Sequence, residues 1–166
     1  MTLTRTQLSF RQLQWLFPIA LTLHNVEEGI WLPAFAAAHR TQVPWTFTPN
    51  EFRIALVVLT AAAWIITMVG WRTGPQSLGT YLEFGYIITV LVNVLVPHVP
   101  AAIFFGGYAP GVVTAVVVNL PVLTLLSTLA IRERYVSGRK AVVFGVAVPL
   151  GIVAVLPVLF ALGRWL

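Results

Sequence analysis

Five long apolar segments constrain the fold of this chain more than any other feature. They cover residues 13–37, 52–71, 79–99, 110–131 and 141–162. Each is long enough to cross about 30 Å of hydrocarbon as a helix, which takes roughly 20 residues. The sequence therefore predicts an all-α membrane protein in which about five transmembrane helices form a bundle, with residues 1–166 as a single integral membrane domain.

The amino-acid composition agrees with a membrane-embedded chain. Apolar residues make up 58% of the sequence and charged residues 9%, which lies far outside the range of soluble globular domains. The connections between the segments are short, so any function is expected within or beside the bilayer. The chain contains no cysteine, which excludes disulfides, thiolate metal ligands, covalent haem attachment and cysteine nucleophiles.

The connection between the third and fourth segments has an unusual composition. Its sequence, VPAAIFFGGYAPG at residues 99–111, is uncharged and apolar, yet it contains two prolines and three glycines, which break helices. Non-helical backbone at membrane depth is tolerated only against protein or water. We therefore expect this connection to be a re-entrant loop that covers an internal site.

The net charge of +5 does not indicate a nucleic-acid partner, because the basic residues lie in short connections rather than in one patch. Their distribution instead predicts an orientation. One side of the membrane would carry Arg5, Arg11, Arg72, Arg132, Arg134, Arg139 and Lys140, and the other side Arg40, Arg53 and Arg164. By the positive-inside rule, we expect a multi-pass protein of the cell membrane with a cytoplasmic N-terminus and an external C-terminus.

The motif HNVEE places ionisable side chains inside the first apolar segment. The chain has five carboxylates, all of them glutamate, and Glu27, Glu28 and Glu83 fall inside predicted spans. Each costs roughly 2.5 to 3.5 kcal/mol near the bilayer centre, so such residues usually face the bundle interior and serve a function. On a helix, His24, Glu27 and Glu28 share one face. Glu83 lies near the cytoplasmic end of its span, where we expect it to pair with Arg72 or to reach water.

The spacing within this motif favours either a metal ion or a shared proton. Side chains four residues apart on one helix can bind a single metal ion, and here that pair is His24 and Glu28. When two neighbouring carboxylates in a poorly solvated site are both ionised, their repulsion has a large free-energy cost. Either a cation lies beside Glu27 and Glu28, or one of them holds a proton at neutral pH. Both arrangements suit catalysis.

The third segment supplies partners for this motif. At a rise of about 1.5 Å per residue, Asn93 lies at the level of Glu27, and His98 lies about 7 to 8 Å farther out. Asn93 and His98 are about 140° apart on a straight helix, so a shared site requires the kink that Pro97 can introduce. Tyr86, on the same segment, is a candidate for substrate contact.

Two further residues are candidates for substrate contact by their depth in the membrane. Asn119, in the fourth segment, lies near the level of His24. Trp31 follows Glu28 by about one helical turn on the same face. We therefore expect the side chains of Asn119 and Trp31 to border the site.

These motifs together resemble those of a known family. HNVEE at residues 24–28, NVLVPH at residues 93–98 and the pair Pro110–Gly111 occur in this order within a short apolar chain. They are similar to the motifs of the HXXEE family of bacterial membrane proteins, which is named for the first motif and carries an Asn and a His separated by four residues and a later Pro-Gly. The resemblance implies an integral-membrane enzyme in which these residues matter, and it supplies no reaction.

The leading hypothesis is a membrane-embedded metalloenzyme. His24, Glu28, His98 and Asn93 are expected to bind one divalent metal, zinc or iron, because mixed nitrogen and oxygen ligands suit both ions. His24, Glu27 and Glu28 are the expected catalytic residues, with Glu27 as the general base. A zinc site predicts hydrolysis of a lipid-like substrate, and an iron site predicts its oxidation or desaturation.

Two other hypotheses remain open from the sequence. A metal-free enzyme would use His24 and Glu28 as an acid/base pair on a terpenoid or sterol-like substrate. A proton-coupled transporter would use the glutamates as an ion relay. In each case the expected partners are membrane lipid and a hydrophobic small molecule, and the assembly state, monomer or homo-oligomer, stays open.

Overall fold

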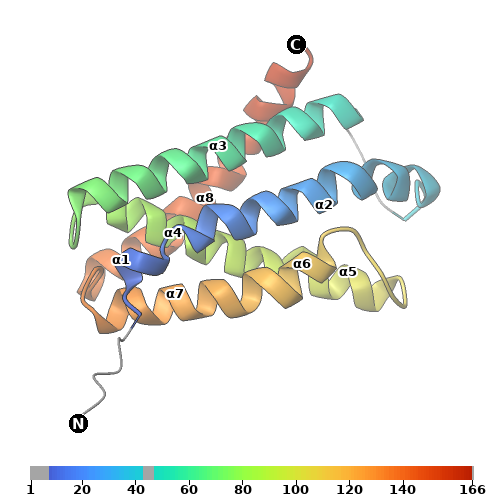
Figure 1. The fold of residues 1–166 in the computed structure, drawn as a ribbon. Coiled ribbons are helices and arrows are strands. Elements are labelled where there is room, and N and C mark those ends of the chain that lie inside the picture. Colours follow the sequence, from blue (N-terminus) through green and yellow to red (C-terminus); the bar gives the residue numbers. More distant parts are fainter. Residues whose placement is uncertain (1–7, 43–46, 166) are drawn as a thin grey trace.

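A computed structural model describes residues 8–42 and 47–165 of the chain, which form an elongated helical bundle (Figure 1). Arg5, which contributed to the predicted orientation, lies outside the described residues. The described part contains no strand, so the predicted all-α fold is confirmed. Its long helices are α2 (Leu16–Ala38), α3 (Pro49–Thr73), α4 (Leu78–Asn93), α7 (Leu120–Arg132) and α8 (Gly138–Gly163).

Short elements join or extend the long helices. The π-helical turn η1 and the helix α5 continue α4, and α6 with the π-helical turn η2 lead into α7. A single turn, α1, precedes α2. Their bounds are Phe10–Leu13 for α1, Val94–His98 for η1, Val99–Phe104 for α5, Val112–Thr114 for α6 and Ala115–Asn119 for η2.

Four of the helical stretches are long and apolar enough to cross a membrane. They are Pro49–Thr73, Leu78–Phe104, Val112–Arg132 and Gly138–Gly163. The fifth long helix, α2, packs against α3 and α7 and has the length of a span, but the polar residues of HNVEE interrupt its apolar sequence. The prediction of a membrane protein is confirmed.

Local sequence signals set the ends of α3 and the start of α4. The hydroxyl of Thr48 accepts a hydrogen bond from the backbone N–H of Glu51, and the Glu51 side chain accepts one from the backbone N–H of Thr48. This capping box satisfies two N–H groups that a helix start leaves unpaired. Gly74, with φ of 75°, ends α3, and Ser77 caps α4.

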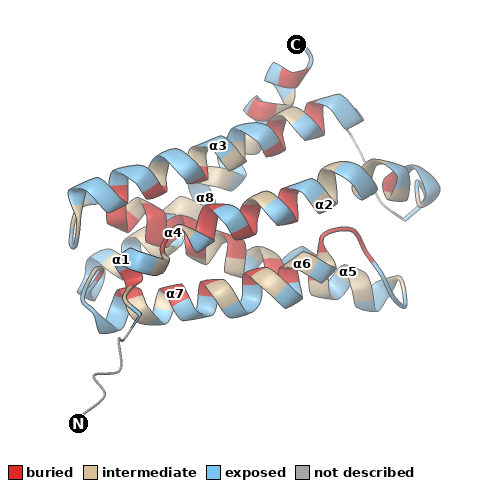
Figure 2. Cartoon of the chain, in the orientation of Figure 1, coloured by how far each residue is buried: buried red, intermediate tan, exposed pale blue. Residues whose placement is uncertain are grey.

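The buried side chains lie where the helices face one another, and the outward faces are exposed (Figure 2). The central helix α4 packs against α3, α7 and α8. Phe17, Ile87 and Leu123 are fully buried in this core, whereas Val142 and Leu150 on α8 are 68% and 65% exposed. An exposed apolar surface on every outward face is what a bundle surrounded by lipid requires.

The helical stretch that contains α4 and α5 is kinked between them. Val96, inside η1, has φ of −146° and ψ of 114°, which is an extended conformation, and Pro97 follows it. Because proline has no N–H group and its ring crowds the preceding turn, a helix kinks at such a position. The bend that the sequence required at Pro97 is therefore present, and it redirects His98.

The connection after this bend is shorter than the sequence predicted. Pro100 does not break the helix as expected, because it lies in the first turn of α5, where a missing N–H group costs nothing. The helix runs on to Phe104, beyond the predicted end at residue 99. Residues 105–111 then turn back toward the bundle, and Ala109, Pro110 and Gly111 are buried there.

Candidate metal centre

Three side chains converge on one point inside the bundle. His24 and Glu28 lie four residues apart on α2, and His98 ends η1. One ligand atom of each lies within 4.8 Å of the other two. Nε2 of His98 is 3.4 Å from Oε1 of Glu28, and Nε2 of His24 is 3.9 Å from Oε2 of the same carboxylate. Such a group can hold a metal ion.

The three side chains are withdrawn from the surface. His24 is 1% exposed and His98 3% exposed, and the side chain of Glu28 is 13% exposed. The two imidazole rings meet edge to face with their centroids 4.7 Å apart. Charges attract one another more strongly here than at a surface, because little water is present to screen them.

Asn93 lies between the two histidines. Its Nδ2 atom is 2.9 Å from Nε2 of His98 and 3.3 Å from Nε2 of His24. An amide N–H group donates, and a ring nitrogen without a proton accepts. Both contacts therefore fit histidines whose Nε2 lone pairs face the point of convergence. The structure brings together all four residues that the sequence predicted as ligands.

Glu27 faces away from this point, toward residues 108–114, where the chain turns back to the bundle after α5. Its Oε1 atom accepts hydrogen bonds from the Tyr108 hydroxyl at 2.9 Å and from the Gly111 N–H at 3.1 Å. Its Oε2 atom accepts from the N–H and the hydroxyl of Thr114 at 2.9 and 2.6 Å. These backbone donors lie at the start of the helix Val112–Arg132, where the helix dipole favours an anion. Glu27 thus ties α2 to this helix start.

The hydroxyl of Thr114 fixes the proton on the His24 ring. It lies 2.6 Å from Oε2 of Glu27 and 3.0 Å from Nδ1 of His24. A hydroxyl has one proton and a carboxylate only accepts, so Thr114 donates to Glu27 and accepts from the Nδ1–H of His24. The Nε2 atom of His24 is therefore the one without a proton, and it faces Asn93 and Glu28.

Tyr108, in the connection between α5 and α6, also holds the Glu27 carboxylate in place. Partial burial and the hydrogen bond to the Glu27 carboxylate raise the pKa of Tyr108 to about 12. Its hydroxyl therefore keeps its proton at neutral pH and remains a donor to Glu27.

Gly111 explains the Pro-Gly pair of the sequence. Its φ of 88° is in the left-handed region, which glycine adopts at no steric cost. A Cβ atom at this position would lie 2.5 Å from Cε1 of His98 and 3.0 Å from Cγ of Glu28. Only glycine lets the returning backbone approach these two side chains so closely.

A cavity of about 460 Å³ adjoins the convergence point. His24, Glu28 and Asn93 border it, and Tyr86 lines its wall while its hydroxyl donates to the Leu59 carbonyl at 2.9 Å. The rest of the lining is mostly apolar and comes from α2, α3, α4, η1 and α8, including Leu21, Leu32, Val90, Val96, Ile152, Leu156 and Phe160. The polar group therefore faces a space suited to a hydrophobic molecule.

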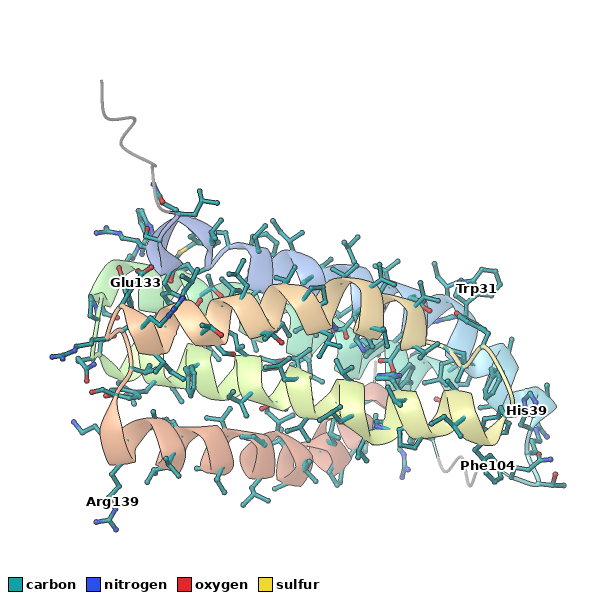
Figure 3. The ribbon with its side chains drawn as sticks, turned by 90° about the horizontal axis from the view of Figure 1, so that it is seen from below. Trp31, His39, Phe104, Glu133 and Arg139 are labelled. Atoms are coloured by element: carbon teal, nitrogen blue, oxygen red, sulfur yellow. The ribbon has the colours of Figure 1, made fainter. Side chains whose placement is uncertain are left out.

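Two predicted substrate contacts do not border this cavity. Trp31 is 57% exposed and lies at the end of the bundle where His39 and Phe104 lie, pointing outward (Figure 3). Asn119 is fully buried, but it is absent from the cavity lining, and its side-chain amide has no hydrogen-bond partner among the described residues. The structure thus separates both residues from the space beside His24 and Glu28.

The prediction for Glu83 is wrong. This residue is fully buried, and the described residues include no ion pair between it and Arg72. Its carboxylate lies against α3 at Gly70, where a Cβ atom would be 2.5 Å from Oε2 of Glu83. The absence of a side chain at Gly70 makes room for the carboxylate, so Glu83 points into the bundle rather than toward water.

Sequence reasoning missed Thr114 and Tyr108. Thr114 follows Gly111 by three residues and lies in the first turn of the helix Val112–Arg132, where a hydroxyl and a backbone N–H can both bind an anion. That local signal was readable in the sequence. The identity of the anion, Glu27, was not, because it depends on how α2 packs against α6.

Comparisons with known proteins agree with these motifs. The family model described as "protein of unknown function with HXXEE motif" matches residues 15–126 of this chain. The chain is 30% identical to the uncharacterized protein YrkK of Bacillus subtilis (strain 168) over 149 residues, which cover 89% of this chain and 92% of that protein. No solved structure matches it. This membrane protein belongs to the HXXEE family.

Proposed function

We propose that this protein is a membrane-embedded, metal-dependent enzyme that acts on a lipid-like substrate. The proposal is carried by the convergence of His24, Glu28 and His98 at the wall of an apolar cavity. Two histidines and one carboxylate form the ligand set of catalytic zinc sites and of non-haem iron sites, and both keep coordination positions open for substrate.

The surroundings of the histidines support metal binding. Thr114 accepts the Nδ1–H of His24 and in turn donates to Glu27, which is the kind of outer hydrogen-bonded chain that orients a ligand histidine. The Asn93 amide contacts both Nε2 atoms. Because each Nε2 has one lone pair, the amide would turn its oxygen toward a metal bound there. Neutral imidazoles with free Nε2 lone pairs are the form that binds a metal ion.

The four hydrogen bonds of Glu27 change the role that we propose for it. Both of its oxygens are engaged by donors of residues 108–114, on the side away from the cavity. We therefore assign Glu27 as a positioning residue that acts through Thr114 on His24, and not as the general base. Glu28 is the carboxylate that borders the cavity.

The lining of the cavity indicates a class of substrate rather than one particular substrate. Its walls are mostly apolar, and its polar side chains gather where His24, Glu28 and Asn93 lie. A molecule with a long apolar part would fit with its reacting group at this end. When bound there, zinc would supply a Lewis acid for hydrolysis, and iron would supply redox chemistry for oxidation or desaturation.

The proposed orientation follows the basic residues. Among the described residues, those assigned to the cytoplasmic side lie at the end of the bundle where α7 ends and α8 begins, and Arg139 and Glu133 mark this end in Figure 3. We propose that this end faces the cytoplasm. Because the chain has no cysteine, single cysteines at Arg139 and Phe104 can be tested with a membrane-impermeant thiol reagent in intact cells. Labelling at residue 104 alone is expected. Labelling at residue 139 alone would indicate the opposite orientation.

Elemental analysis of the full-length protein tests the function directly. The protein is purified in detergent without added metal or chelator, as the wild type and as Glu28→Gln, His98→Ala and Glu83→Gln. We expect near-stoichiometric zinc or iron in the wild type and in Glu83→Gln, which changes a buried carboxylate outside the centre, and loss of the metal in the other two. Metal in none of the samples, even after incubation with zinc or iron(II), would favour a metal-free acid/base enzyme.

A further inference from the structure

A second space lies on the outward side of α2 and α3, apart from the candidate metal centre. It is a groove of about 600 Å³. Val26, Ile30 and Val57 line it and are 53%, 56% and 68% exposed. The remaining lining residues are Thr22, Asn25, Gly29, Arg53, Leu56, Thr60, Ala61 and Trp64. In a membrane this apolar groove faces the lipid chains.

A wall separates this groove from the cavity beside His24. Asn25 and Leu56 line both spaces. The side-chain amide of Asn25 donates to the Thr60 hydroxyl at 2.7 Å and to the Leu56 carbonyl at 3.4 Å. This hydrogen-bonded contact joins α2 to α3, so the groove is a distinct site.

A fixed cation lies at one end of the groove. Pro33 has no N–H group, so the Gly29 carbonyl one turn earlier lacks its helical donor. Nε of Arg53 donates to that carbonyl at 3.0 Å. The guanidinium group has five N–H donors, so four remain after this bond. Arg53 is exposed and forms no ion pair with the described residues.

The other end of the groove is marked by Trp64. Its indole N–H donates to the Thr22 hydroxyl at 3.2 Å. The helix rises about 16 Å between Arg53 and Trp64, which is close to half the thickness of the hydrocarbon core. The groove therefore has the length of one acyl chain in one leaflet, with a cation at the end nearer the start of α3.

We propose that this groove binds an anionic phospholipid of the surrounding membrane. One acyl chain lies along the apolar lining, and the phosphate lies on the free N–H groups of Arg53. A guanidinium group suits this role, because it binds phosphate oxygens through two parallel hydrogen bonds. The bond from Nε to Gly29 holds Arg53 at the mouth of the groove, so less side-chain freedom is lost when the lipid binds.

Native mass spectrometry of the full-length protein tests this proposal. The delipidated protein is incubated with equal amounts of dioleoyl phosphatidylglycerol and dioleoyl phosphatidylcholine, which share their acyl chains and differ in net charge. Two variants address the site: Arg53→Gln removes the charge but keeps a donor for the Gly29 carbonyl, and Ala61→Phe fills the groove. Two controls lie on the same helix outside the groove: Arg72→Gln and Val58→Phe.

The wild type and both controls are expected to retain one phosphatidylglycerol in preference to phosphatidylcholine. Arg53→Gln is expected to lower that preference by about fivefold, the effect of one arginine near a charged headgroup. Ala61→Phe is expected to reduce retention of both lipids. Glycerol 3-phosphate, which has the charge without the chain, is expected not to displace the lipid. An unchanged preference in Arg53→Gln, an equal loss in Arg72→Gln, or unchanged retention in Ala61→Phe would overturn the proposal.

Discussion

Nε2 of His98 lies 3.4 Å from Oε1 of Glu28, although the two residues belong to helices that are far apart in the sequence. Two features make this approach possible. The extended conformation of Val96 redirects His98 toward α2, and Gly111 leaves space for both side chains beneath the returning backbone. The candidate centre therefore depends on residues that would themselves bind no metal, and several predictions can be made from them.

Replacing Gly111 should disturb the centre more than replacing a neighbouring glycine. Gly111→Ala would place a Cβ atom 2.5 Å from Cε1 of His98 at a φ of 88°, so we expect a loss of roughly 1 to 3 kcal/mol in the free energy of unfolding and a lower metal content. Gly107→Ala is the matched control, because nothing lies within 4 Å of its Cβ position. Thermal unfolding and elemental analysis measure both effects. Equal behaviour of the two variants would contradict the close approach.

Removing the Thr114 hydroxyl should weaken metal binding without removing a ligand. Thr114→Val keeps the shape of the side chain but eliminates the acceptor of the His24 Nδ1–H and a donor to Glu27. Loss of such outer contacts lowers metal affinity by about 10- to 100-fold, which a competitive titration with a chromophoric chelator measures. Thr128→Val, whose hydroxyl bonds only within α7, should leave the affinity unchanged. If both variants bind metal as tightly as the wild type, Thr114 does not orient His24.

Tyr108 gives a prediction with a defined pH dependence. Tyr108→Phe removes one donor to Glu27 and should cost about 1 kcal/mol in the free energy of unfolding. Because the folded-state pKa of Tyr108 is raised from 10.0 to about 12, this contribution is fully present below pH 10 and is lost as the pH rises toward 12. Denaturant unfolding of both proteins between pH 7 and 11 measures the difference. A difference that is already shrinking between pH 7 and 9 would contradict this pairing.

Filling the cavity should separate substrate binding from metal binding. Leu156 lines the cavity on α8 but is not part of the metal group, so Leu156→Trp should leave the metal content unchanged and weaken binding of a fluorescent fatty acid. Val158→Trp, at a position 57% exposed on the same helix, serves as the control. If the two variants bind the probe equally, the cavity is not the binding site.

The fold was largely predictable from the sequence, because the length of apolar segments fixes the possible structures in a membrane. Local details were less predictable. Pro100 looked like a helix breaker, yet a proline in the first turn of α5 is tolerated. Glu83 looked like an interfacial residue, yet it is buried against Gly70 of another helix. Both differences depend on position within a helix or on packing between helices.

The candidate site was predictable where spacing along one helix decides it. His24 and Glu28 share a face by their separation alone, and the need for a bend at Pro97 could be stated in advance. The role of Glu27 could not, because its partners Tyr108 and Thr114 come from the returning chain. Side chains from elements far apart in the sequence are brought together by tertiary packing, which spacing along one helix does not reveal.

The most direct measurement is metal K-edge X-ray absorption of the metal-loaded protein, for the wild type and for His98→Ala. In the wild type we expect nitrogen and oxygen ligands at about 2.0 to 2.2 Å, with scattering from two imidazole rings. His98→Ala should either lose the metal or keep it with one imidazole ring. A wild-type spectrum without imidazole scattering, or one that His98→Ala does not change, would contradict a metal centre formed by His24, Glu28 and His98.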